Sequence, residues 1–180
     1  MRMNQQDVLS AHSLVNTYEE EALRQVFWQY GELRTAPVLA KTIVQARQIT
    51  SIDTTFDLKT VLKKHLPQGR ENKILAQIYQ AIRIEVNQEI EVLKAFLLQT
   101  PSLLKTDGRL SVISYHSLED RLVKRFIRNG LFEGEPEKDV FGNFEVPLKK
   151  VGSLIIPTSA EIKSNNRARS AKLRIAKKVK

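Results

Sequence analysis

The chain of 180 residues contains no cysteine, which excludes disulfide bonds and thiolate metal sites. It also lacks a signal or transit pattern and any apolar run long enough to cross a bilayer, so we expect a cytoplasmic protein with no membrane partner. Its three histidines, His12, His65 and His116, do not have the spacing of a zinc site. A Ser-His-Asp or phosphate-loop signature is missing as well, and we therefore expect neither metal catalysis nor hydrolysis.

Glycine is scarce too, and its positions exclude one kind of cofactor turn. A nucleotide-type cofactor needs a Gly-rich turn between a strand and a helix, because glycine lets the backbone approach the cofactor closely. No two glycines of this chain have a G-x-G spacing ahead of a helix. The seven glycines are Gly31, Gly69, Gly108, Gly130, Gly134, Gly142 and Gly152.

Acidic residues almost disappear from the last part of the chain. Residues 149–180 hold ten Lys or Arg and one acid, whereas residues 1–148 hold nineteen of each sign, so this tail carries the whole net charge of +9. Localised positive charge favours polyphosphate partners such as RNA, although a solvated basic terminus that only aids solubility has the same composition. The residues of the tail that we expect to contact RNA are Arg167, Arg169, Lys172 and Arg174.

Three segments have the pattern of strands. Apolar and basic residues alternate over residues 171–175, which predicts a strand with one buried face and one solvated face that carries the charges. Residues 154–156 are apolar and are followed by Pro157, which ends a strand ladder. Residues 110–115 form the third predicted strand.

The third strand passes directly into a polar cluster and a helix. Leu110, Val112 and Ile113 suit a largely buried strand, and Ser117 with Asp120 three residues later suits a helix cap. In open α/β sheets, ligands bind outside the carboxyl ends of strands. Helix caps have the same composition, so the residues alone leave a site and a scaffold equally open. The candidates for a site wall are His116, Ser117, Glu119 and Asp120, with Arg121 orienting an acid or contacting phosphate.

The part before this strand has helical periodicity. Leu23, Val26, Phe27 and Tyr30 share one face of a first helix, ended near Gly31. A second helix begins near Pro37, a third is capped by Thr54 or Thr55, and the longest runs from about Asn72 to Gln99. We expect Phe27, Tyr30 and Tyr79 to be core residues rather than base-stacking platforms, with Trp28 as the exception.

Three separated blocks, residues 80–89, 108–121 and 166–174, resemble the MraW family of ribosomal RNA small-subunit methyltransferases, and residues 30–32 with 43–47 add a fourth. The resemblance implies methyl transfer from S-adenosylmethionine to the exocyclic N4 of a cytidine in small-subunit ribosomal RNA. It implies an α/β fold, with the last three strands of a partial Rossmann-like class I methyltransferase sheet preceded by an all-α insertion domain. The corresponding domains are residues 1–70, for substrate recognition, and residues 71–180.

The resemblance also implies that the family's cofactor site precedes the matched region. Met1 to Asn4 resemble a segment that lies well inside family members, so we expect the S-adenosylmethionine site upstream of Met1 and no turnover by this chain alone. A sheet without its neighbouring strands exposes an edge, through which we expect self-association. The alternative left open is a non-catalytic module that binds RNA or a partner.

Overall fold

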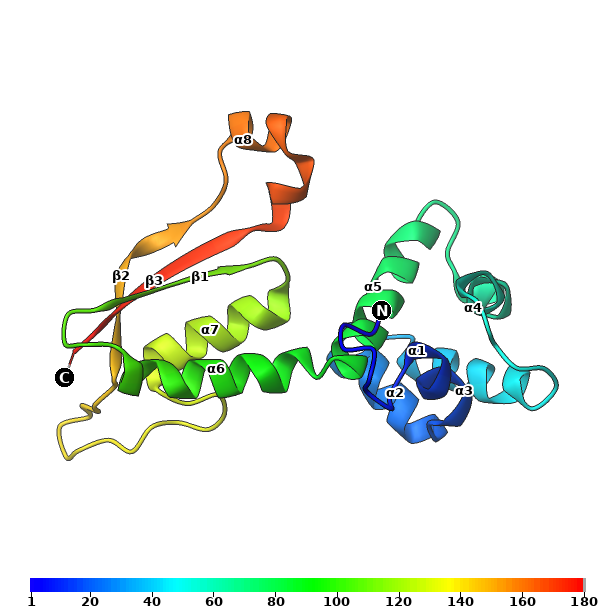
Figure 1. The fold of residues 1–180 in the computed structure, drawn as a ribbon, viewed down its shortest axis with the longest axis horizontal. Coiled ribbons are helices and arrows are strands. Elements are labelled where there is room, and N and C mark those ends of the chain that lie inside the picture. The colour runs from blue at the N-terminus through cyan, green and yellow to red at the C-terminus, as the bar shows by residue number, and fades with distance from the viewer. Residues whose placement is uncertain (180) are drawn as a thin grey trace. The chain divides into compact units, whose positions relative to one another are not determined.

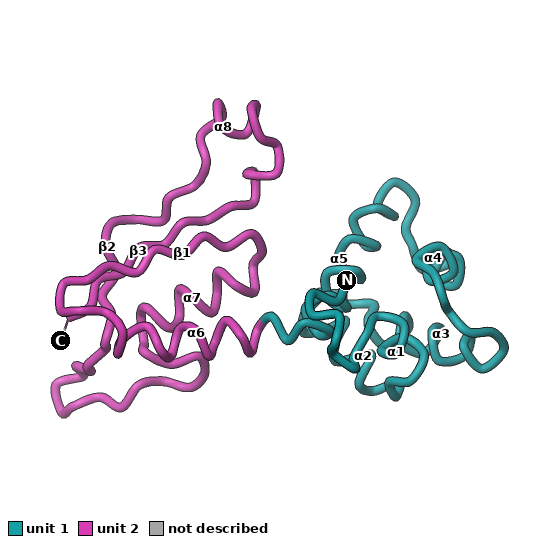
Figure 2. The backbone as a smooth tube through the Cα atoms, in the orientation of Figure 1, with its two compact units in different colours: residues 1–89 teal, residues 90–180 magenta. Residues whose placement is uncertain are grey.

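The computed structural model describes residues 1–179; Lys180, counted above in the basic tail, lies outside the described residues. The chain divides into two compact units, Met1–Glu89 and Ile90–Lys180 (Figure 2). The expected domain boundary after residue 70 falls inside the first unit, just before its last helix. Within the described residues, no helix has both the length and the apolar character needed to span a bilayer.

The first unit is built from helices alone (Figure 1). Pro37 lies in the first turn of its third helix, and the Thr54 hydroxyl accepts a hydrogen bond from the Asp57 backbone at 3.1 Å, so both predicted helix starts are confirmed. The elements are α1 (Ala11–Thr17), α2 (Glu20–Gln29), α3 (Ala36–Arg47), α4 (Thr55–Leu62), a 3-10 turn (Lys63–His65) and α5 (Glu71–Val86).

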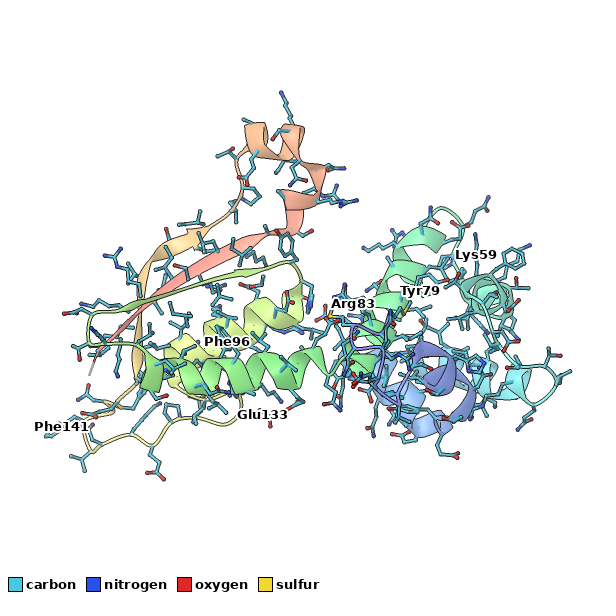
Figure 3. The ribbon with its side chains drawn as sticks, viewed as in Figure 1. Lys59, Tyr79, Arg83, Phe96, Glu133 and Phe141 are labelled. Carbon is cyan, nitrogen blue, oxygen red and sulfur yellow. The ribbon has the colours of Figure 1, made fainter. Side chains whose placement is uncertain are left out.

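Aromatic and aliphatic side chains fill one core in this unit. Phe27 of α2, Leu39 of α3 and Ile78 of α5 are fully buried in it. Tyr79 on α5 (labelled in Figure 3) is partly buried against the core. Its hydroxyl donates a hydrogen bond of 3.0 Å to the Thr55 carbonyl. Trp28 is 56% exposed, which confirms it as the exception among Phe27, Trp28, Tyr30 and Tyr79.

The predicted single helix over residues 72–99 is wrong, because the chain leaves the helical conformation at Gln88. Its φ of 49° lies in the left-handed region, between the end of α5 and the start of α6 (Glu89–Leu103). The side-chain amide of Asn87 donates a hydrogen bond of 2.8 Å to the Arg83 carbonyl, and it thereby satisfies a backbone acceptor at the end of α5. The continuous apolar stripe therefore serves two cores, with Ile82 in the first and Leu97 in the second.

The second unit continues after α6 with a sheet and its connecting elements. These are β1 (Arg109–Ser114), α7 (Ser117–Asn129), β2 (Leu148–Ile155), α8 (Ser159–Ser164), a 3-10 turn (Asn166–Ser170) and β3 (Lys172–Lys178). The sheet has the order β1-β3-β2, with both strand pairs antiparallel. This confirms the three predicted strands, although β2 begins well before residue 154. Helix α7 packs against all three strands.

Helix α7 covers one face of this sheet, and the other face is partly exposed. Leu110 and its register partner Ala176 are buried in a core with Phe126 of α7. Strand side chains alternate between faces, so Ile113 lies on the opposite face and is 57% exposed. The expectation that Ile113 is buried is therefore wrong. Ile155, on that same face, is 49% exposed. Self-association through the exposed sheet stays a prediction.

Candidate functional site

The polar cluster after β1 begins with the residue that caps α7. His116 is the N-cap, and its Nδ1 accepts a hydrogen bond of 3.4 Å from the Glu119 backbone. The expected cap by Ser117 and Asp120 is wrong by one residue, because the extended backbone at His116 and the spacing to Glu119 complete a capping box there. Since Nδ1 is the acceptor, Nε2 carries the proton of the neutral ring.

Glu119 closes this turn from the helix side. Its Oε2 accepts hydrogen bonds from the backbone of Tyr115 at 2.9 Å and of His116 at 3.3 Å. Burial raises the pKa of Glu119, but the close His116 ring and the hydrogen bond from the Tyr115 backbone outweigh it and hold the pKa below its usual value. Glu119 is therefore an ionised group that holds the strand-to-helix turn in place.

Two buried polar atoms at this turn have no hydrogen-bond partner within the described residues: Ser114 Oγ, at the last residue of β1, and His116 Nε2. Nε2 lies 3.1 Å from Glu119 Oε1, but the alignment is too poor for a hydrogen bond. Unpaired buried polar groups are costly, and proteins keep them where a ligand or function uses them. The carboxyl end of β1 is therefore the best candidate for a polar ligand contact.

Asp120 points to β3 instead. Its carboxylate receives hydrogen bonds from Arg174 Nε at 2.7 Å and Nη2 at 3.1 Å, and from Lys172 Nζ at 3.3 Å. Burial raises the pKa of Asp120, but the hydrogen bonds and charges of Arg174 and Lys172 outweigh it and lower the pKa. The carboxylate thus joins the first turn of α7 to the central strand of the sheet.

Two cations of β3, Lys172 and Arg174, lie on the face of the sheet that α7 covers. The predicted alternation is present, but Arg174 and Lys172 are on the face packed by α7, whereas Leu173 shares the other face with Ile113. The expectation of a solvated charged face is wrong here, because Asp120 of α7 supplies a buried partner for the cations. Among the other predicted RNA contacts, Arg121 on α7 and Arg167 and Arg169 in the 3-10 turn are exposed.

The sequence did not predict a pocket of about 360 Å³ that lies beside α7 and β2 and is lined by Lys124 and Arg128. Four basic residues, Arg121, Lys124, Arg125 and Arg128, recur on α7 at helical spacing. This basic stripe was the available signal.

The described residues do not fit a nucleoside cofactor. The turn from β1 to α7 consists of Tyr115 and His116 and has no glycine to admit a close approach of the backbone. Glycines with positive φ lie elsewhere, at Gly69, Gly130, Gly134, Gly142 and Gly152.

Comparison with known proteins agrees with the resemblance seen in the sequence. The chain is 66% identical over 179 residues to ribosomal RNA small subunit methyltransferase H of Christiangramia forsetii and of Flavobacterium johnsoniae, covering 99% of this chain and 59% of each relative. It is 48% identical over 178 residues to the enzyme of the same name from Cytophaga hutchinsonii, covering 99% of this chain and 60% of that relative. The chain thus spans about three fifths of the length of these relatives. With residues 1–179 matched, the chain belongs to the MraW methylase family.

Proposed function

We propose that this chain contributes the substrate-facing part of an S-adenosylmethionine-dependent methyltransferase that methylates N4 of a cytidine in small-subunit ribosomal RNA. Membership of the MraW methylase family along residues 1–179 carries this proposal. The name of the relatives, ribosomal RNA small subunit methyltransferase H, supports it.

The sheet, on this proposal, is the last part of a Rossmann-like class I methyltransferase sheet. An antiparallel pair at one edge and a helix that follows β1 support this interpretation. Ligands of open α/β sheets bind outside the carboxyl ends of the strands. His116 lies at the carboxyl end of β1, which is where the target base would be held.

The reaction needs accurate placement from the protein. The N4 lone pair of cytosine is conjugated with the ring, so the amino group is a poor nucleophile and must be held by hydrogen-bond acceptors. A base that leaves its stack presents its Watson–Crick edge to a pocket. In this proposal the wall of that pocket is His116, Ser117 and Glu119, and the exposed Arg121, Arg167 and Arg169 bind the RNA phosphates. Asp120, Lys172 and Arg174, which were also expected at these contacts, pair with one another and hold α7 against β3 behind the wall.

S-adenosylmethionine is the methyl donor that this reaction requires. Residues 1–179 offer its nucleoside no Gly-rich turn between a strand and a helix. We therefore assign no donor contact to the described residues, and we expect no turnover from the 180-residue chain alone.

Disruption of the gene for this chain tests the proposed reaction. Small-subunit ribosomal RNA would be purified from parent, disrupted and complemented cells, and its nucleosides would be separated and quantified by mass spectrometry. We expect N4-methylated cytidine to be lost on disruption and restored on complementation. An unchanged amount in the disrupted cells would overturn the proposal.

A non-catalytic module that binds RNA or a partner is the second candidate, and the lack of a cofactor turn favours it. Calorimetric titration of the 180-residue chain with S-adenosylmethionine tests whether this chain binds the methyl donor. No heat of binding supports the absence of a donor contact. Saturable micromolar binding would overturn it, whereas an intact methyl mark in disrupted cells, together with RNA binding by the chain, would identify the module.

A further inference from the structure

The pocket beside α7 and β2 combines an apolar floor with a basic rim. Ile127 and Leu148 are buried in the floor, and Leu154 is half-buried there. Within the described residues, none of those that line the pocket is acidic. Its volume of about 360 Å³ is within the range of small-ligand sites.

A bulge in β2 forms one wall of this pocket. Val151 pairs with Ile175, and the next pair is Ile155 with Leu173. Between these two pairs β2 therefore contains two more residues than β3. The extra residues include Gly152, whose φ of 67° suits glycine. Bulges redirect side chains, and here Ser153 and Leu154 line the pocket.

The cations of the rim differ in how their charge is balanced. Arg174 lines the pocket but is held by Asp120, so its charge is already matched. Lys124, Lys149 and Lys150 are exposed lining residues, and Arg128 donates from Nε to the neutral Asn129 side chain at 2.9 Å. The rim therefore presents excess positive charge above an apolar floor.

We propose that this pocket takes a nucleotide of single-stranded RNA, with the base against the apolar floor and the neighbouring phosphates on Lys124, Lys149 and Lys150. Bases present flat apolar faces, and phosphates need cations that are not already paired. The inference rests on the proposed function and gives its RNA a second contact, away from the turn at His116. A neighbouring hollow lined by Glu135, Glu137 and Asp139 repels phosphate, so the RNA is confined to the basic side.

Fluorescence anisotropy of a labelled single-stranded RNA of about 12 nucleotides, titrated with the 180-residue chain, tests this inference. Replacing Lys124, Lys149 and Lys150 together by alanine should weaken binding at least about tenfold and reduce the salt slope by about two. Replacing the exposed Lys73, Lys105 and Lys138 by alanine is the charge-matched control, expected to change affinity by less than about twofold.

Filling the pocket tests the base contact without changing charge. Ser153→Leu should weaken RNA binding at least about fivefold with an unchanged salt slope, whereas Ser153→Ala should bind as the parent chain does. Equal losses in both lysine triples, or full binding by Ser153→Leu, would overturn the inference. So would a pocket triple that changes only the sedimentation of the chain, because the face would then be an interface between copies.

Measurement of N4-methylated cytidine in cells distinguishes a failure of this inference from a failure of the proposed function. If cells with the disrupted gene lose N4-methylated cytidine while the pocket triple binds RNA as the parent does, the pocket assignment fails and the proposed function stands. If disruption leaves the mark intact while the triple weakens RNA binding, the proposed function fails and the binding site stands.

Discussion

The carboxylate of Asp120 is nearly enclosed between α7 and β3, with Arg174 and Lys172 on its two oxygens. Asp120→Asn would leave the guanidinium of Arg174 without its anion in a mostly buried place. We expect the free energy of unfolding to fall by about 2 to 3 kcal/mol, measured by urea titration at neutral pH. Asp107→Asn, which removes an exposed pair with Lys177, is the control and should leave that free energy unchanged.

The same pair makes stability depend on pH. Because the folded pKa of Asp120 is below its unfolded value, the ionised carboxylate stabilises the fold above the unfolded value of about 4. This contribution is lost as the pH falls toward the folded pKa. The difference in unfolding free energy between the parent and Asp120→Asn should therefore shrink below about pH 4. A difference that stays constant down to the lowest pH would contradict the pairing.

His116 has a capping role and a proposed substrate role that two substitutions separate. Asn caps helices well, so His116→Asn should keep the stability of α7, whereas His116→Ala should lose about 1 kcal/mol. If the proposed base contact is correct, both variants should lower the N4-methylcytidine mark in complemented cells at least about tenfold. A normal mark with His116→Asn would reduce His116 to a structural cap.

At the scale of elements, the break between α5 and α6 depends on one residue with positive φ. Gln88 adopts φ 49°, which costs an ordinary side chain free energy that glycine does not lose. Gln88→Gly should raise the unfolding free energy of the first unit by about 1 kcal/mol, followed by the fluorescence of Trp28. Gln88→Ala should match the parent. A destabilising Gln88→Gly would mean that the side chain itself holds the break.

At the scale of the whole molecule, each unit has a separate core, and Trp28, the single tryptophan, lies in the first. Leu23→Ala in the first core should shift the unfolding transition seen by Trp28 fluorescence, with a loss of about 2 to 5 kcal/mol. Leu148→Ala in the second core should shift a transition seen by far-UV circular dichroism and leave the fluorescence transition in place.

The half-exposed Val38 provides the control for these core substitutions, and Val38→Ala should shift neither transition. If Leu23→Ala and Leu148→Ala shift both probes equally, the two units unfold as one cooperative body. Coincident midpoints in the parent chain alone would not decide this, because two units of equal stability also unfold together.

Local patterns in the sequence determined much of this protein. The starts at Pro37 and Thr54, the core position of Phe27 and the strand before His116 depend on neighbours along the chain, so periodicity and capping were sufficient to predict them. The four family blocks likewise depend only on the order of residues.

Only the tertiary structure decided which side chains meet. Asp120 and Arg174 are 54 positions apart in sequence, and strand register rather than spacing brings them together. Because α7 covers only one face of the sheet, Ile113 on the other face is exposed. The turn at Gln88 divides one apolar stripe between two cores. The bulge at Gly152 formed the basic pocket from segments whose charges looked unrelated in the sequence. Burial and pairing arise from contacts across the fold, which residue order alone does not determine.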